Sequence, residues 1–322
     1  MWRAYAAFMR EKYSHVIIAT LVAGLITGLF STAPGLFIRR FATLLIVIMI
    51  GAMGFTIRVR SLGRALKDGW AFLLGLALNF IFAPLLCWAL ATVLLKGHPD
   101  LAAGLILIGV VPCAGMALVW TGLLKGDVPL ATVVNAATMI AAPFLIPWLM
   151  QLLAGAFVAI DAAAMFQSVM LTVLAPIIAG IILREALERR RDMAPYVPIM
   201  PAISGGAAVF LMFMAVNTSV PLVRSNLAWI GPLAAALVLV FPVLFIGAYA
   251  ISRTFLPTGK NIAVTFSSGM KNLPIAVAIA AVSFNELAMF PVALGFAFQM
   301  ISAVCFYRMF LKSHYPETAR PA

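Results

Sequence analysis

The sequence predicts an all-α polytopic membrane protein with ten transmembrane helices, and three observations support this. Of the 322 residues, 64% are hydrophobic and only 10% are charged, which leaves too little polar surface for a soluble domain of this size. The apolar residues form runs of about 20, the length that crosses a bilayer as a helix. The positive charges follow membrane topology, so the net charge of +12 does not indicate nucleic acid binding.

Charges, prolines and glycines divide the apolar sequence into ten runs. These runs cover residues 14–34, 38–57, 69–95, 99–124, 128–154, 165–186, 198–218, 226–252, 257–283 and 287–311. The first run has no small-residue cleavage site behind it and is interpreted as a retained span, not as a signal peptide. The fourth and ninth runs differ from the others, because each has Gly, Pro and polar residues in its middle.

Lysine and arginine indicate how the chain is oriented in the membrane. With the N-terminus in the cytoplasm, the opposite face holds Arg39, Arg40, Lys96 and Arg224, and Lys271 lies inside a span. All other cations fall in cytoplasmic segments: Arg3, Arg10, Lys12, Arg58, Arg60, Arg64, Lys67, Lys125, Arg184, Arg189, Arg190, Arg191, Arg253, Lys260, Arg308, Lys312 and Arg320. We therefore expect a multi-pass protein of the bacterial inner (plasma) membrane with both termini in the cytoplasm.

Ten spans divide into two halves of five, and an odd number per half inserts the second half upside down, a common design in transporters. A faint internal similarity follows this division. Pro84 in span three and Pro242 in span eight lie in similar apolar contexts, and each is followed about thirty residues later by a Gly-Met pair, Gly115-Met116 and Gly269-Met270. We expect a single transporter domain, residues 1–322, with repeats at about 14–154 and 165–311.

The two interrupted spans are the predicted site of function. Span four contains Pro112 to Met116 and span nine contains Ser267 to Pro274. Pro removes a backbone donor and Gly weakens a helix. Unwound backbone at membrane depth is tolerated only inside protein or beside a water-filled cavity, and its free N–H and C=O groups can bind a solute or an ion. The alternative is that these residues serve only kinks and close helix packing.

Lys271 is the one ionisable group, apart from cysteine thiols, that we place deep inside a span. Such a charge is costly unless it faces a cavity or a partner. Lys271 could be a lysine that snorkels to the interface. It could instead bind an anion, carry a proton, or stand as a tethered cation where a metal ion would otherwise bind.

A few polar side chains accompany this lysine at span depth. They are Asn79, Asn135, Thr265, Ser267, Ser268 and Asn272. Together with Lys271 they could form one polar pocket, although each of them could also be an ordinary hydrogen-bonding contact between helices. Gln299 and Tyr307 look like packing or interface residues.

The cysteines and histidines exclude two kinds of site. Cys87, Cys113 and Cys305 all lie in apolar stretches and form no disulfide framework. The three histidines lie at segment edges, so no intramembrane metal cluster is expected. Cys113 could be a small packing residue, or a soft thiol ligand at the helix break beside Pro112.

Around both breaks the sequence resembles one transporter superfamily. The run from Gly109 to Trp120 (GVVPCAGMALVW) resembles the fourth helix of the arsenical-resistance (ACR) family of arsenite permeases. Gly269 to Asn272 (GMKN) is similar to the Gly-Met-Gln-Asn of the bile acid:sodium symporter (BASS) family. The resemblance implies two inverted five-helix repeats, with helices four and nine broken and crossing. It also implies a panel of spans 14–57 and 165–218 and a core of spans 69–154 and 226–311.

The departures from these families bear on the transported solute. Sodium-coupled members have a Glu where this chain has Ser267 and a Gln where it has Lys271. Other sodium ligands of the family align with Ala117, Leu118, Ala131, Asn135 and Asn79. The resemblance therefore implies that the sodium sites are largely lost, since a lysine repels a hard cation, while proton coupling stays possible. The Glu in the ninth helix of the arsenite permeases aligns with Asn272, and their cysteine matches Cys113.

The sequence thus predicts a secondary-active transporter, a symporter or antiporter without a cofactor. Its expected substrate is a small-molecule anion paired with Lys271 and moved by alternating access, independently of sodium. The alternative is arsenical efflux that uses Cys113, and a second alternative is a non-transporting receptor or scaffold. An intramembrane enzyme would require clustered His, Asp or Glu at span depth. The expected surroundings are the lipid bilayer and no nucleic acid.

Overall fold

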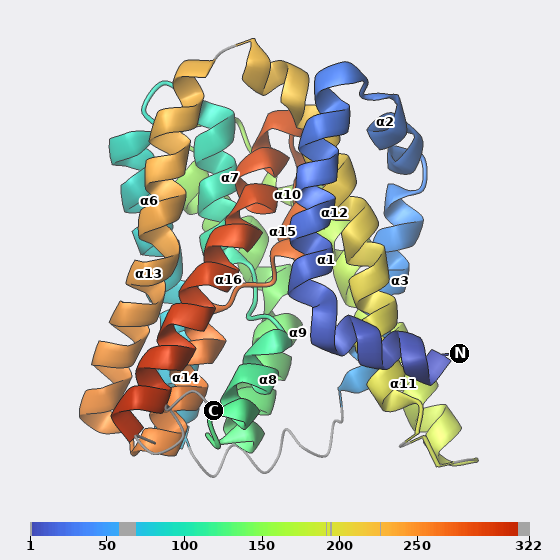
Figure 1. Cartoon of the computed structure of the whole chain (residues 1–322), viewed down its shortest axis with the longest axis vertical. Coiled ribbons are helices and arrows are strands. Elements are labelled where there is room, and N and C mark those ends of the chain that lie inside the picture. The colour runs from blue at the N-terminus through green and yellow to red at the C-terminus, as the bar shows by residue number, and fades with distance from the viewer. Residues whose placement is uncertain (1, 58–68, 191, 194, 226, 315–322) are drawn as a thin grey trace.

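The computed structural model describes residues 2–57, 69–190, 192–193, 195–225 and 227–314, and every regular element within these ranges is a helix (Figure 1). The long helices run side by side along the longest axis of the molecule (Figure 1). Some cations that the sequence assigns to the cytoplasm lie outside the described residues: Arg58, Arg60, Arg64, Lys67, Arg191 and Arg320. The expected all-α fold class is confirmed.

The first half of the chain forms α1 (Trp2–Phe30), α2 (Ala33–Arg39), α3 (Ala42–Thr56), α5 (Gly69–Ala77), the π-helical turn η2 (Leu78–Phe82), α6 (Ala83–Leu94), α7 (Pro99–Val110), α8 (Met116–Leu123) and α9 (Val128–Ala154). The second half forms α10 (Ala162–Val169), the π-helical turn η3 (Met170–Leu174), α11 (Ala175–Glu188), η4 (Val197–Ile199), α12 (Met200–Arg224), η5 (Leu227–Trp229), α13 (Ile230–Phe255), α14 (Thr258–Gly269), α15 (Leu273–Ser283) and α16 (Glu286–His314).

Six continuous helical stretches in the described part of the chain are long and apolar enough to cross a membrane. They run over Gly69–Leu94, Val128–Ala154, Ala162–Glu188, Met200–Arg224, Leu227–Phe255 and Glu286–Phe310. Counting the bent pair His15–Phe30 and Ala33–Arg39 as one span gives seven. The chain is therefore a multi-pass membrane protein, as the sequence predicts.

The first predicted span, 14–34, ends earlier in the structure, because the chain turns after Phe30 and α2 leaves at 118° to α1. The Asn217 amide of α12 holds this turn. Its Nδ2 donates to Thr27 Oγ1 at 3.0 Å and to the Ser31 carbonyl at 3.1 Å, and its Oδ1 accepts from the Gly35 N–H at 3.0 Å. A side chain at position 35 would overlap that amide oxygen, so the turn requires glycine.

A proline follows each of the two π-helical turns. Pro84 comes two residues after η2 and Pro176 two residues after η3. Proline lacks an N–H and clashes with the carbonyl of the preceding turn, and a wider turn relieves that clash. The wider turn η2 carries Asn79, and π-helical turns are frequent at functional sites.

The helices break at the two segments where the sequence predicts interruptions. α7 ends at Val110 and Val111 is already extended, because the residue before a proline disfavours the helical conformation. α14 ends at Gly269, with Met270 extended. α15 then begins with Asn272 as its N-cap, whose Oδ1 accepts from the Ile275 N–H at 3.4 Å.

Packing separates the helices into two groups that meet along α12 and α16. α12 packs against α1 and α3, and α3 packs against α11. In the other group, α7 packs against α6, α9 and α16, and α14 packs against α13, α8 and α9. At the end of the bundle where α16 begins, Arg39 of α2 forms an ion pair with Glu286. There the Ser219 hydroxyl also donates to the Glu286 carbonyl at 2.8 Å.

Candidate functional site

The two interrupted helices meet at their breaks as a short antiparallel ladder in which Cys113 is paired with Lys271. The Ala114 N–H donates to the Met270 carbonyl at 2.8 Å, and the Asn272 N–H donates to the Pro112 carbonyl at 2.9 Å. In Figure 1, α7 and α15 lie in the upper half of the bundle and α8 and α14 in the lower half. The breaks therefore satisfy part of each other's backbone in the middle of the protein.

The Lys271 ammonium is fully buried, with a relative exposure of 0%, and is held by three oxygens. Its Nζ donates to the Asn79 carbonyl at 3.0 Å, to Asn79 Oδ1 at 3.1 Å and to the Val111 carbonyl at 3.3 Å. An ammonium has three N–H donors, so all of them are used. These acceptors are neutral, which means that no carboxylate among them cancels the buried charge.

Asn79 is the centre of this arrangement because it connects three elements. Besides the two contacts of its oxygens with Lys271, its Nδ2 donates to the Gly75 carbonyl at 2.9 Å and to the Ser267 carbonyl at 3.2 Å. The latter carbonyl lies in the last turn of α14, whose end would otherwise leave it unpaired. The turn η2 therefore positions one amide to bind both the lysine and the helix that leads to it.

Gln299 of α16 also belongs to this site, although its apolar sequence context suggests only a packing role. The Lys271 N–H donates to Gln299 Oε1 at 2.7 Å, and Gln299 Nε2 donates to the Lys271 carbonyl at 3.1 Å. The side chain is buried. The signal in the sequence is a lone amide in an apolar helix, and a buried amide must find hydrogen-bond partners; what the sequence does not give is which helix supplies them.

Cys113, on the other strand of the ladder, is held by two side chains of α9. Asn135 Nδ2 donates to the Cys113 carbonyl at 2.9 Å and to its Sγ at 3.2 Å. The Cys113 N–H donates to Thr138 Oγ1 at 3.3 Å. Both extended segments are therefore fixed from outside by a neighbouring helix, segment 112–114 by α9 and segment 270–272 by α16.

Several hydroxyls at the end of α14 lack hydrogen-bond partners. Thr265, Ser267 and Ser268 are buried, and their hydroxyl oxygens make no hydrogen bond of ordinary geometry in the described part of the chain. The Ser267 hydroxyl lies near the Cys113 thiol. Elsewhere in this chain a helical Ser or Thr commonly donates to the carbonyl four residues earlier, as Thr121 and Ser252 do. These hydroxyls are thus available to water or to a ligand.

The crossing opens to the outside at Gly115, the exposed residue before α8. A side chain there would meet no atom within 4 Å. In the described part of the chain the N–H groups of Gly115 and Met116 make no hydrogen bond, and Met116 is half-buried. Asn272 lies across the break, with its Nδ2 3.8 Å from Met53 Sδ of α3. It therefore touches the other group of helices.

The structure thus brings most of the expected site residues to one place. Asn79, Cys113, Asn135, Ser267 and Lys271 are connected through the contacts above. Pro112, Met270 and Asn272 form the ladder. Gly115 and Met116 form its exposed edge, and Ser268 lies beside Ser267 without a contact to the lysine. Within the described residues, no three His, Cys, Asp or Glu side chains are grouped so as to hold a metal ion.

A family model described as "Sodium Bile acid symporter family" matches residues 42–221 of the chain. This segment includes the first break and ends before the second. A sodium-dependent transporter YocS of Bacillus subtilis, itself described as uncharacterized, is 27% identical over 268 residues, which are 81% of this chain and 80% of the relative.

Two further relatives come from different settings. A probable sodium/metabolite cotransporter BASS1 from chloroplasts of Arabidopsis thaliana is 28% identical over 263 residues, 81% of this chain and 62% of that protein. The arsenical-resistance protein Acr3 of Corynebacterium glutamicum is 27% identical over 225 residues, 65% of this chain and 61% of that protein.

Proposed function

Since this chain belongs to the sodium bile acid symporter family, we propose that it is a secondary transporter that moves a small anionic solute, without sodium, past the crossing of its two broken helices. The family consists of membrane transporters and not of enzymes, so the chain is a membrane transporter. The proposal makes three more detailed claims, which concern the membrane topology of the protein, its independence of sodium and the charge of its solute.

We propose that the chain has ten spans in two inverted repeats, with both termini in the cytoplasm. Counting α7–α8 and α14–α15 as one broken span each, together with α1, α3 and the six long stretches, gives ten. Contacts between loops and span ends support this order. Arg39 with Glu286 and His98 with Trp229 join segments that the sequence assigns to the outer face. Asp127 with Gly259 joins a loop and a span end assigned to the cytoplasmic side.

The same topology assigns the two packing groups to the two moving parts. The panel would be spans 14–57 and 165–218, and the core spans 69–154 and 226–311. The contact of Asn272 with Met53 supports a solute path between them, because it joins the break in the core to α3 of the panel. Rocking of one group against the other around a fixed site is how inverted-repeat transporters exchange access.

The main support for sodium independence is the position of the Lys271 ammonium, which lies among three oxygens of Asn79 and Val111. Carbonyl and amide oxygens at such a point would suit a hard monovalent cation. Here a cation is already present and covalently attached. A sodium ion bound nearby would be repelled by that charge, so the resident lysine replaces the coupling ion.

The same charge favours an anionic solute. The hydrogen bonds of the ammonium go to neutral atoms, so the crossing keeps a net positive potential, and the free N–H groups of Gly115 and Met116 point the positive end of α8 at the open side. Lys271 itself has no donor left and is buried. It therefore acts on the solute through its field, and the direct hydrogen bonds come from the backbone and from Asn272.

Two observations favour the arsenical alternative: the Cys113 thiol lies at the crossing beside Ser267, and a relative is an arsenical-resistance protein. A trivalent arsenical binds thiolate sulfur, and the described residues provide one thiol on this ladder. Small carboxylates, phosphate-like anions and arsenite can be compared directly, in a thermal-shift screen of the wild type, Lys271→Gln and Cys113→Ala.

Stabilisation by an anion that is lost in Lys271→Gln and kept in Cys113→Ala supports the proposal, and the reverse pattern with arsenite supports the alternative. Uptake of the stabilising anion into proteoliposomes, with and without a sodium gradient, then tests coupling. Transport that is strictly dependent on sodium would refute the proposed role of Lys271. A protein that binds but does not transport would be a receptor, the second alternative.

A further inference from the structure

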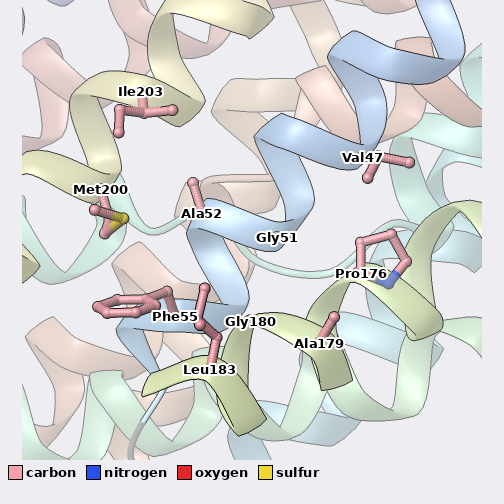
Figure 2. Close-up of a pocket in the computed structure, with 10 residues that line it drawn as sticks. All are labelled: Val47, Gly51, Ala52, Phe55, Pro176, Ala179, Gly180, Leu183, Met200 and Ile203. Atoms are coloured by element: carbon pink, nitrogen blue, oxygen red, sulfur yellow. The ribbon is translucent and has the colours of Figure 1, made fainter. Parts of the chain in front are cut away.

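An open groove of about 270 Å³ lies between α3, α11 and α12, away from the broken helices. Figure 2 shows the residues that line it. All are apolar: Val47, Gly51, Ala52 and Phe55 of α3, Pro176, Ala179, Gly180 and Leu183 of α11, and Met200 and Ile203 of α12. None of the residues that line this groove belongs to the transport site described above.

Close packing of glycines produces the groove. Gly180 lies so near α3 that a side chain there would overlap the Gly51 carbonyl oxygen, and the two helices pack backbone to backbone. Gly51, in contrast, has room beside it on the groove side, because a Cβ added there would meet only the Pro176 carbonyl oxygen, at 3.6 Å. The floor is therefore empty because residue 51 has no side chain and not because the backbone leaves no room.

An apolar slot on a membrane protein is filled by hydrocarbon, because the lining offers no side-chain hydrogen bond and a polar occupant would lose its hydration without replacement. The residues near the end of the groove indicate what kind of molecule supplies this hydrocarbon. Pro176, Gly180 and Leu183 follow helical spacing along one face of α11. The helix ends at Glu188, five residues beyond Leu183 and about 8 Å further along the helix axis.

Arg189 and Arg190 directly follow α11, and both are exposed. They differ from Arg184, which is buried and donates to the Phe55 and Thr56 carbonyls at 3.0 and 2.7 Å and to Glu188 at 3.0 Å. Arg184 closes the end of α3 against α11. The two exposed arginines are left at the membrane surface, where cations attract anionic lipid headgroups.

We propose that this groove binds one acyl chain of an anionic phospholipid, with the phosphate of the headgroup at Arg189 and Arg190. A second copy of the chain is a poorer occupant, because a two-fold interface on this face would bring the same two arginines of both copies together. A lipid, in contrast, has hydrocarbon and negative charge in the same order as the groove and the arginines.

Native mass spectrometry of the full chain in detergent tests this, with phosphatidylglycerol and phosphatidylcholine of identical acyl chains as probes. We expect the wild type to retain phosphatidylglycerol more tightly, with about a fivefold loss of that preference for each arginine in Arg189→Ala and Arg190→Ala. Gly51→Leu fills the floor and should reduce retention of both lipids. Arg224→Ala and Val238→Leu, exposed positions at the other end of α12 and on α13, are matched controls.

Equal retention of the two lipids, or retention that Gly51→Leu leaves unchanged, overturns the proposal. Ala179→Leu, at an exposed position of the lining, provides the same test if Gly51→Leu does not fold. If Gly51→Leu instead converts a dimer to a monomer without changing lipid retention, the occupant is a second copy and the proposal fails.

Discussion

Gln299 and Lys271 exchange two hydrogen bonds, one from the backbone N–H of residue 271 and one to its carbonyl. In an extended segment these groups point away from the N–H and C=O of the neighbouring residues, here Met270 and Asn272, which pair with the segment around Cys113. Segment 270–272 is therefore hydrogen-bonded along both edges, as a central strand is. One edge partner is backbone and the other is a side-chain amide.

Replacing Gln299 with Leu should destabilise the protein more than an ordinary polar-to-apolar change. The substitution leaves the buried N–H of Lys271 without a partner, at a cost of about 1–3 kcal/mol. It also removes one of the two hydrogen bonds that the Lys271 carbonyl accepts, and only the one from the Leu273 N–H remains. The melting temperature in detergent measures this cost. Gln167→Leu, at an exposed position of α10, is the control and should change little. A Gln299→Leu protein as stable as wild type would show that the pair does not hold the break.

Removing the resident cation and restoring the groups of sodium-coupled relatives should create a response to sodium. Lys271→Gln frees the oxygens of Asn79 and Val111, and Ser267→Glu returns a carboxylate to the end of α14. We expect thermal stabilisation by sodium chloride, relative to potassium chloride, in this double variant and none in the wild type. Sodium-specific stabilisation of the wild type would contradict the replacement of the ion by Lys271.

The place of the two helix breaks could be predicted from the sequence because the signals for them are local. Pro112, Gly115 and Gly269 interrupt apolar runs, and a helix cannot continue through such residues at membrane depth without protein around it. The one cation at span depth, Lys271, pointed to the same segment. The all-helical fold followed from composition and from the lengths of the apolar runs.

The partners in this site could not be predicted, because they depend on which helices cross. The sequence predicts a direct pairing of Lys271 with an anion, yet the three donors of its ammonium are taken by Asn79 and Val111. Val111 contributes through a backbone carbonyl that no sequence pattern reveals. Gln299 lies 28 residues from Lys271, and its sequence context suggests a packing residue. The early end of the first span at Phe30 depends on Asn217, which is 182 residues from Gly35.

The turn between α1 and α2 should depend on Asn217 and Gly35 as a unit. Asn217→Leu removes three hydrogen bonds, and Gly35→Ala places a methyl group against the amide oxygen. Each should lower the melting temperature, by the equivalent of about 1–3 kcal/mol. The double variant should lose less stability than the sum of the losses in the two single variants, because both substitutions break the same contact. Full additivity would show that the two residues act independently.

The ion pair of Arg39 and Glu286 should bias the protein toward the state closed at the end where α2 meets α16. Arg39 is 47% exposed and Glu286 27%, so the pair is worth about 0.2–1 kcal/mol, and Arg39→Gln should shift the populations by about fivefold at most. Spin labels at Leu36→Cys and Val282→Cys, with Cys305→Ser, report the separation of α2 from α15 by pulsed electron resonance. We expect a longer or broader distance distribution in Arg39→Gln and Glu286→Gln. Arg40→Gln, the adjacent exposed arginine, should leave it unchanged. An equal change in Arg40→Gln would mean that net charge at this end, and not this ion pair, sets the equilibrium.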